Sequence, residues 1–168
     1  MSNHVPSTVK TNRGYFGIGV YNPKTEENIG TLWRHANNFN ADFIFTIGRR
    51  YSKQASDTSA TPRHIPLYNY VDFDDFYVHM PYDCQLIGVE LNKRSQSLPS
   101  FVHPERVIYL LGAEDHGLPE AVMAKCLHLV EIPTARPQSM NVAVSGTLVM
   151  YDRFTKLADH PDVAGKGK

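Results

Sequence analysis

Short apolar runs that alternate with helical segments constrain the fold of this chain more than any other feature. The runs expected to form β-strands are residues 15–21, 42–47, 65–70, 85–90, 107–111 and 127–132. Between the first two, from Thr25 as N-cap to Asn38, apolar side chains recur at i, i+3, i+4 and i+7, the spacing of one helical face. Strands that alternate with helices predict an α/β fold, a parallel sheet with helices on both of its faces.

The last helical segment is the most apolar part of the chain. Shorter helical turns are expected at 72–78 and 119–125, and a long helix at 139–157. The first three turns of the long helix carry no charge, and its apolar side chains spread widely around the helix. Because such a helix must be buried on more than one face, we expect it to pack on the sheet and also on a second copy of the chain. Val149 and Phe154 are candidate positions in this homodimer interface.

The composition is that of one domain. The 168 residues, 42% of them apolar, contain enough material for a single core. We expect one domain over residues 1–158 and a disordered, glycine-rich tail over 159–168. Cys84 and Cys126 have no neighbouring cysteine and are expected to be reduced core thiols. No apolar run reaches membrane-spanning length and the first residues are polar, so we expect a cytoplasmic protein without membrane contact.

Charge is balanced in total but not along the chain. There are 17 Lys and Arg residues against 17 Asp and Glu, so any nucleic-acid partner must be held by a local patch. Residues 1–70 contain eight basic and four acidic residues, and the remainder contains nine and thirteen. In the basic half, Arg49, Arg50 and Lys53 surround Tyr51, whose ring can stack on a base. This cluster is the candidate contact for a nucleic-acid partner such as RNA; an ordinary solvated loop is the alternative.

Two of the expected strands end in loops that suit a ligand site. The strand 107–111 runs into the acidic, glycine-flanked segment 112–118, and the strand 127–132 runs into residues 133–141 before the last helix. In α/β folds, ligands bind in the loops at the carboxyl ends of parallel strands. A glycine at position 112 lets the backbone approach a ligand closely. The ligand is therefore expected across these two loops.

Three motifs stand in a fixed order along the chain. They are Asn28, Gly30 and Arg34; then Gly112, Glu114, Gly117 and Leu118; and finally Ser139, Met140, Asn141 and Val142. In this order and spacing, with the last motif opening a hydrophobic helix, they resemble the SpoU/TrmH branch of the SPOUT methyltransferases, which are RNA ribose 2′-O-methyltransferases. The resemblance runs from about Tyr15 to Leu157 and is to the small, single-domain members.

The resemblance implies an S-adenosylmethionine-dependent, homodimeric enzyme that acts on tRNA or rRNA and whose C-terminal part forms a trefoil knot. The residues that it assigns to the cofactor are Glu90, Leu91, Leu111, Gly112, Ile132, Ser139, Met140 and Asn141. Those that it assigns to catalysis are Arg34, Asn28, Glu114, Ser139 and Asn141. The alternative function is that of a non-catalytic RNA-binding or assembly protein that retains this fold.

Arg34 is the residue expected to carry the chemistry. It lies one turn after Gly30 on the same helical face, so the missing side chain leaves room for a substrate backbone beside the guanidinium. The family assigns the matching arginine to deprotonation of the ribose hydroxyl. A guanidinium with a pKa above about 12 stays charged, so we favour a cation that binds a phosphate and stabilises the forming alkoxide.

The other motif residues have structural alternatives. Asn28 and Ser139 could be helix caps, and Asn141 a polar residue of a first helical turn. Glu114 is expected to hold a backbone or an arginine in place rather than to react. His116 stands beside two acidic residues, but neighbouring loop residues rarely converge on one ion, so no metal site is expected.

Overall fold

A seven-stranded parallel sheet forms the centre of the structure, a computed structural model that describes residues 14–50 and 65–157. The strands are β1 (Tyr15–Tyr21), β2 (Phe43–Ile47), β3 (Leu67–Tyr70), β4 (Gln85–Val89), β5 (Gln96–Ser97), β6 (Arg106–Leu111) and β7 (His128–Glu131). Their order is β3-β2-β1-β6-β4-β7-β5, and each pairing is parallel. All carboxyl ends therefore reach the same edge of the sheet.

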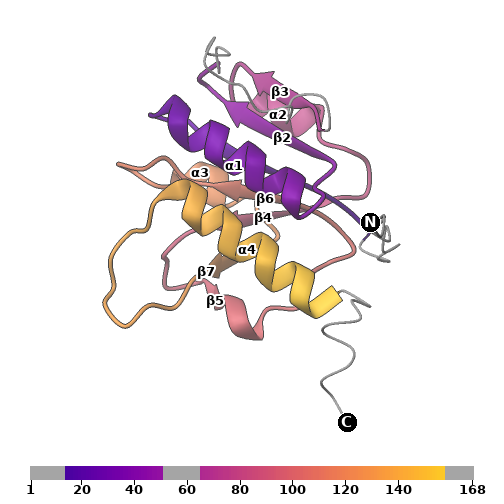
Figure 1. The fold of residues 1–168 in the computed structure, drawn as a ribbon. Helices are drawn as coiled ribbons and strands as arrows, with labels where there is room; N and C mark the ends of the chain where they lie inside the picture. Colours follow the sequence, from indigo (N-terminus) through magenta and orange to yellow (C-terminus); the bar gives the residue numbers. More distant parts are fainter. Residues whose placement is uncertain (1–13, 51–64, 158–168) are drawn as a thin grey trace, which may run out of the picture.

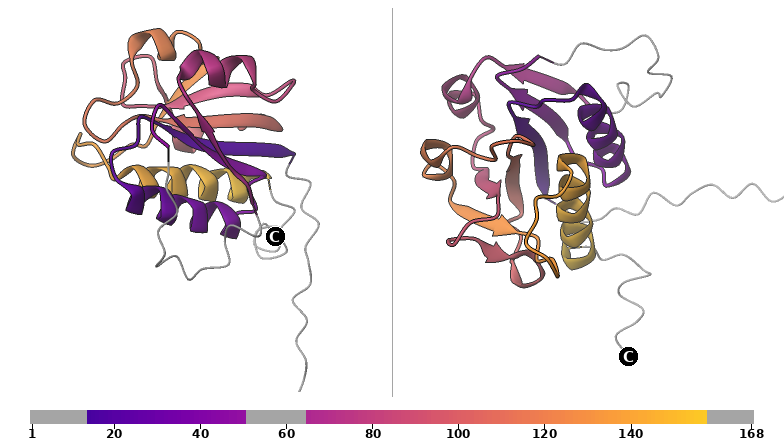
Figure 2. Two further views of the ribbon diagram at one scale, coloured as in Figure 1. Left: turned by 90° about the horizontal axis from the view of Figure 1, so that it is seen from above. Right: turned by 90° about the vertical axis from the view of Figure 1, so that its left-hand side faces the viewer.

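Helices cover both faces of this sheet (Figures 1 and 2). The helices α1 (Glu26–Asn38) and α4 (Val142–Leu157) lie side by side on one face, and α2 (Phe73–Val78) and α3 (Glu120–Met123) lie on the other. The predicted α/β class with a parallel sheet is confirmed. The trefoil knot stays a prediction, and the expected tail, 159–168, lies outside the described residues.

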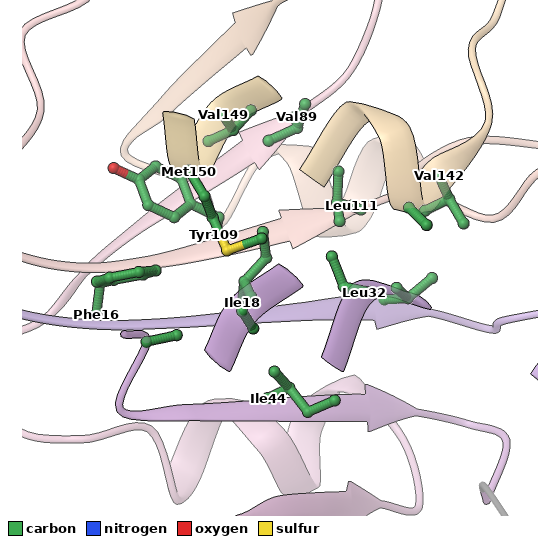
Figure 3. Close-up of a cluster of buried hydrophobic side chains, with 14 of the residues drawn as sticks. Phe16, Ile18, Leu32, Ile44, Val89, Tyr109, Leu111, Val142, Val149 and Met150 are labelled. Carbon is green, nitrogen blue, oxygen red and sulfur yellow. The ribbon is translucent and has the colours of Figure 1, made fainter. Parts of the chain in front are cut away.

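The strands are buried because helices cover both faces. All five residues of β2 are buried, as are the five inner residues of β1, which explains why these strands are continuous apolar runs rather than alternating ones. Figure 3 shows the core on the α1 and α4 side, where Ile18 and Leu111 of the sheet meet Leu32 of α1 and Val149 of α4. On the opposite side, the ring of Phe45 stacks on Phe76 of α2 with centroids 4.6 Å apart.

The terminal helix begins at Val142, three residues later than predicted. The Asn141 side-chain oxygen accepts hydrogen bonds from the backbone amides of Ala143 at 2.9 Å and Val144 at 3.2 Å, so Asn141 caps the helix. Ser139 consequently lies in the preceding loop and is not the cap. The two-residue strand β5 and the 3₁₀ turn η2 (Leu98–Ser100) were not predicted, because segments this short have no apolar period.

A buried polar cluster anchors the C-terminal half of α4. The ring of His103 lies 2.6 Å from the Tyr109 hydroxyl and 2.8 Å from the Asp152 carboxylate. Arg153, 2% exposed, donates to two carbonyl groups of the segment before β6, at 2.6 and 2.9 Å. Burial lowers the pKa of His103, although its bond to Asp152 acts in the opposite direction. These bonds hold α4 in one position on the sheet.

Candidate active site

A cavity of about 330 Å³ lies at the carboxyl edge of the sheet, where β4, β6 and β7 end. Its volume is within the range of small-molecule sites. The expected cofactor residues that line it are Glu90, Leu91, Leu111, Gly112, Ile132, Ser139 and Met140. Asn141, also expected to contact cofactor, is not part of the lining, because its side chain caps α4 and points to α1.

The segment 112–118 forms one wall of this cavity, and Gly112 lets it fold back on itself. A Cβ atom on Gly112 would lie 2.5 Å from the backbone of Gly117 and 2.7 Å from that of Leu118. The Gly117 amide donates to the Ala113 carbonyl at 2.9 Å, which closes the loop. The structure thus requires glycine here for close packing of backbone on backbone, while its approach to a ligand stays a prediction.

Glu90 braces the same wall from β4. One carboxylate oxygen accepts a hydrogen bond from the Leu118 amide at 2.7 Å, and the other accepts one from the Leu91 amide at 3.1 Å. Glu90 therefore positions the loop in addition to lining the cavity. Sequence reasoning placed this residue at the site but not in this bracing role.

Hydrogen bonds join one side chain from each of the three motifs at the rim of the cavity. Asn28 donates to Glu114 at 2.8 Å, and Asn141 donates to the side-chain oxygen of Asn28 at 2.9 Å. The second oxygen of Glu114 accepts from the backbone amide of Lys24 at 3.1 Å. We refer to Glu114, Asn28 and Asn141 as the rim network. It connects the loop after β6 with the starts of α1 and α4.

Glu114 is held in its ionised form. Burial disfavours the charge, but hydrogen bonds from the Asn28 side chain and from backbone amides outweigh burial and lower the pKa of this carboxyl group. An ionised carboxylate only accepts hydrogen bonds, and one with a lowered pKa is a weak base. Its geometry is that of a positioning group. A carboxyl group whose pKa is lowered by folding stabilises the fold at pH values above its ordinary pKa. This contribution to stability is lost as the pH falls and Glu114 is protonated.

Arg34 does not line the cavity. Its side chain is exposed on α1, six residues beyond Asn28, and it is not among the lining residues. Six residues of helix correspond to about 9 Å along the axis. The structure therefore brings Asn28, Glu114, Ser139 and Asn141 to the site but leaves Arg34 on the outer surface of the helical layer.

The expected RNA-binding residues are described in part. Arg49 and Arg50 are exposed after β2, and Arg49 donates to the Lys24 carbonyl at 2.9 Å. Lys53 lies outside the described residues. Sequence reasoning missed Lys24, whose ammonium lies 2.5 Å from the Asp115 carboxylate. A single lysine in a loop carries no pattern that could have identified it.

Two further properties concern residues 14–50 and 65–157 alone. Within these ranges, no three His, Cys, Asp or Glu side chains gather in a group that could hold a metal ion. No helix in the same part of the chain combines the length and the apolar character that crossing a bilayer requires.

Fold and site together define the class. The chain forms a parallel α/β domain whose last strands and terminal helix enclose a cavity at the carboxyl edge of the sheet. Three motifs meet at the rim of this cavity, which is the arrangement expected of the SPOUT class. The chain belongs to the SpoU rRNA methylase family, whose sequence profile matches residues 16–151.

Known proteins resemble the chain in sequence and in structure. Over 68 residues, which are 40% of this chain and 4% of the relative, it is 37% identical to tRNA (guanosine(18)-2'-O)-methyltransferase TARBP1 of Mus musculus. The AdoMet-bound rRNA methyltransferase from Sinorhizobium meliloti matches with a TM-score of 0.75 at 21% identity, over 88% of this chain and 58% of that one. A structure that concerns 2-OH methylation of C/U34 on tRNA has a TM-score of 0.72 at 23% identity, over 86% and 91%. These structural likenesses show the fold.

Proposed function

We propose that this protein transfers a methyl group from S-adenosylmethionine to a ribose 2′-hydroxyl of tRNA or rRNA. The rim network carries the proposal, because it joins the three motifs beside a cavity lined by the residues expected to hold the cofactor. Family membership and the named activities of the similar proteins support the same reaction.

The residues present suit S-adenosylmethionine. Leu111, Ile132 and Met140 supply apolar surface for an adenine ring, and Ser139 and Glu90 supply polar groups for the ribose and amino-acid parts. Bound S-adenosylmethionine would supply an electrophilic methyl group on its sulfonium. The chain's own residues orient it: Glu90 braces the loop wall, and the rim network fixes the entry of α4 relative to that wall.

The reaction also requires activation of the ribose hydroxyl, which is a poor nucleophile. A ribose hydroxyl loses its proton to solvent water as it attacks, so a fixed cation near the forming alkoxide stabilises the transition state. Arg34 is our choice for that cation, with substrate positioning supplying much of the remaining acceleration. Glu114 holds the rim in place and is a weak base, because hydrogen bonds lower the pKa of its carboxyl group.

We further propose a homodimer through the outer surface of α1 and α4. Val144, Leu148 and Tyr151 recur at i, i+4 and i+7 on α4; Val144 is 46% and Tyr151 54% exposed. Val149, a candidate interface position in the sequence, is fully buried in the protomer core. Phe154 is half-buried, its ring 6.0 Å from that of Phe39. Arg34 lies on the same outer layer, so dimer formation would direct it toward the other protomer.

Tyr151→Asp is expected to convert the dimer to monomers without unfolding them. An unpaired charge in an apolar interface is destabilising, whereas Tyr151 is largely exposed in the protomer. Sedimentation velocity at micromolar concentration measures the change. Val78→Asp on α2 is the matched control, since Val78 is 74% exposed on the opposite helical layer and should leave the dimer intact. A fully dimeric Tyr151→Asp variant would place the interface elsewhere.

Cofactor binding is the direct test of the proposed function. We expect calorimetry to show micromolar affinity for S-adenosylhomocysteine, and mapping to find a 2′-O-methyl group missing from tRNA or rRNA of cells that lack the gene. Undetectable binding with an unchanged methylation map would favour the non-catalytic RNA-binding protein. The expected cytoplasmic location stays a prediction.

A further inference from the structure

A second hollow lies beside the cofactor cavity, on the other side of the loop after β6. Its volume is about 660 Å³, and it is lined by the ends of β1 and β2 and by the loop after β6. Ala113, Asp115, His116 and Gly117 line both spaces, so this loop is their common wall. The two spaces adjoin along the carboxyl edge of the sheet.

The two hollows differ in volume. The first, at about 330 Å³, is at the lower end of the range for small-molecule sites, and its proposed occupant is the cofactor. A substrate RNA must therefore lie outside it while still reaching its rim. The second hollow has twice that volume and begins at the shared wall.

The lining of the second hollow suits a nucleotide. Tyr21 and His116 provide rings, and Pro23 provides an apolar surface, on which a base can stack or rest. Lys24 and Arg49 provide cations for a phosphate. The carboxylate in the lining is Asp115, and it is paired with the Lys24 ammonium at 2.5 Å. Both partners are largely exposed, so a phosphate can replace the carboxylate at little cost.

Basic residues also line the surface next to the second hollow, farther from the cofactor cavity. A third, smaller hollow of about 130 Å³ shares Pro23, Lys24 and Arg49 with the second one and adds Arg50 to its lining. Lys24, Arg49 and Arg50 therefore line two adjoining hollows, with Glu26 as the acidic residue of the third, and adjoining cations suit contact with a nucleic-acid backbone.

Backbone contacts hold the floor of the second hollow in place. The Asn22 amide donates to the Ile47 carbonyl at 2.8 Å, and the Gly48 amide donates to the Tyr70 carbonyl at 2.9 Å. Gly48 has a φ of 86°, and a Cβ atom there would overlap the Asn22 side-chain oxygen. The loops after β1 and β2 are thus packed together before any ligand binds.

We infer that the second hollow binds an unpaired nucleotide of the substrate RNA adjacent to the one that is methylated. Its base contacts Tyr21, and its phosphate binds Lys24 and Arg49. The inference rests on the proposed function and adds the position of the strand and the residues that hold it.

The contributions of base stacking and phosphate binding to RNA affinity can be distinguished by measuring how that affinity depends on salt concentration. Tyr21→Leu should weaken binding of an oligouridylate about twelve nucleotides long by about tenfold. The salt slope, which is the slope of log binding constant against log salt concentration, should not change. Tyr21→Phe should bind like the wild type. Lys24→Gln should lower the slope by about 0.7, the value for one phosphate contact on a single strand. Lys125→Gln is the matched control, since Lys125 lies on the opposite helical layer and should change neither quantity.

Two further measurements make the test decisive. His116→Ala should weaken binding in the same direction as Tyr21→Leu, and because His116 is exposed this variant leaves the core untouched. S-adenosylhomocysteine affinity should be unchanged in Tyr21→Leu and Lys24→Gln, because neither side chain lines the cofactor cavity. Wild-type RNA affinity in Tyr21→Leu and His116→Ala, with an unchanged salt slope in Lys24→Gln, would overturn the inference and leave the proposed function intact. A wild-type protein that binds neither S-adenosylhomocysteine nor the oligouridylate would contradict both.

Discussion

Arg34→Ala should lower the rate of methyl transfer by about a hundredfold or more, which is the usual cost of removing one preorganised charge donor. The fold and the affinity for S-adenosylmethionine should change little, because Arg34 is exposed and does not line the cofactor cavity. Single-turnover rates on the substrate RNA and calorimetric titration of the cofactor measure the two effects. Arg94→Ala is a matched control, since Arg94 is an exposed arginine that pairs with Glu120 away from α1.

Arg34→Lys distinguishes a cation from a base. If the guanidinium acts as a fixed charge, lysine should restore part of the rate with little change in the pH profile, and the missing part reflects the lost planar fork. If the group accepts the proton, the lower pKa of lysine should move the alkaline limb of the profile. Full activity in Arg34→Ala would contradict both roles and direct attention to Glu114 or to the RNA itself.

The second large effect is expected at Gly112. Gly112→Ala should weaken S-adenosylhomocysteine binding by about ten- to a hundredfold, because the new Cβ must displace the backbone of Gly117 and Leu118. That displacement moves the cavity wall and pulls the Leu118 amide from the Glu90 carboxylate. Calorimetry measures the affinity, and thermal unfolding shows how much of the change is a general loss of stability.

Gly30→Ala is the matched control for Gly112→Ala. Gly30 lies inside α1, where alanine favours the helix by up to about 1 kcal/mol, and it is not part of the cavity lining. This variant should bind S-adenosylhomocysteine like the wild type and unfold at the same or a higher temperature. Wild-type cofactor affinity in Gly112→Ala would show that the loop can shift without cost to the site.

Local patterns predicted the elements that carry the fold. The bounds of β1 and of α1 agree with the sequence prediction, because apolar period depends on residues a few positions apart. Thr25 is the N-cap residue of α1, as predicted, although its side chain makes no capping hydrogen bond. The predicted helix α2 is also present, and there the Asp72 side chain caps the helix. The cavity lining was also predictable in large part, since the carboxyl ends of parallel strands meet at one edge.

Contacts between distant segments could not be read from those patterns. Periodicity shows that α4 is apolar on several sides, yet only packing decides that Val149 is buried in the core while Tyr151 is exposed. The rim network links Asn28 to residues 86 and 113 positions away, and the second hollow arises where the loops after β1, β2 and β6 converge. Side-chain period specifies which face of an element is buried, whereas the neighbour on that face follows from the order of the strands and the long-range packing of helices on them.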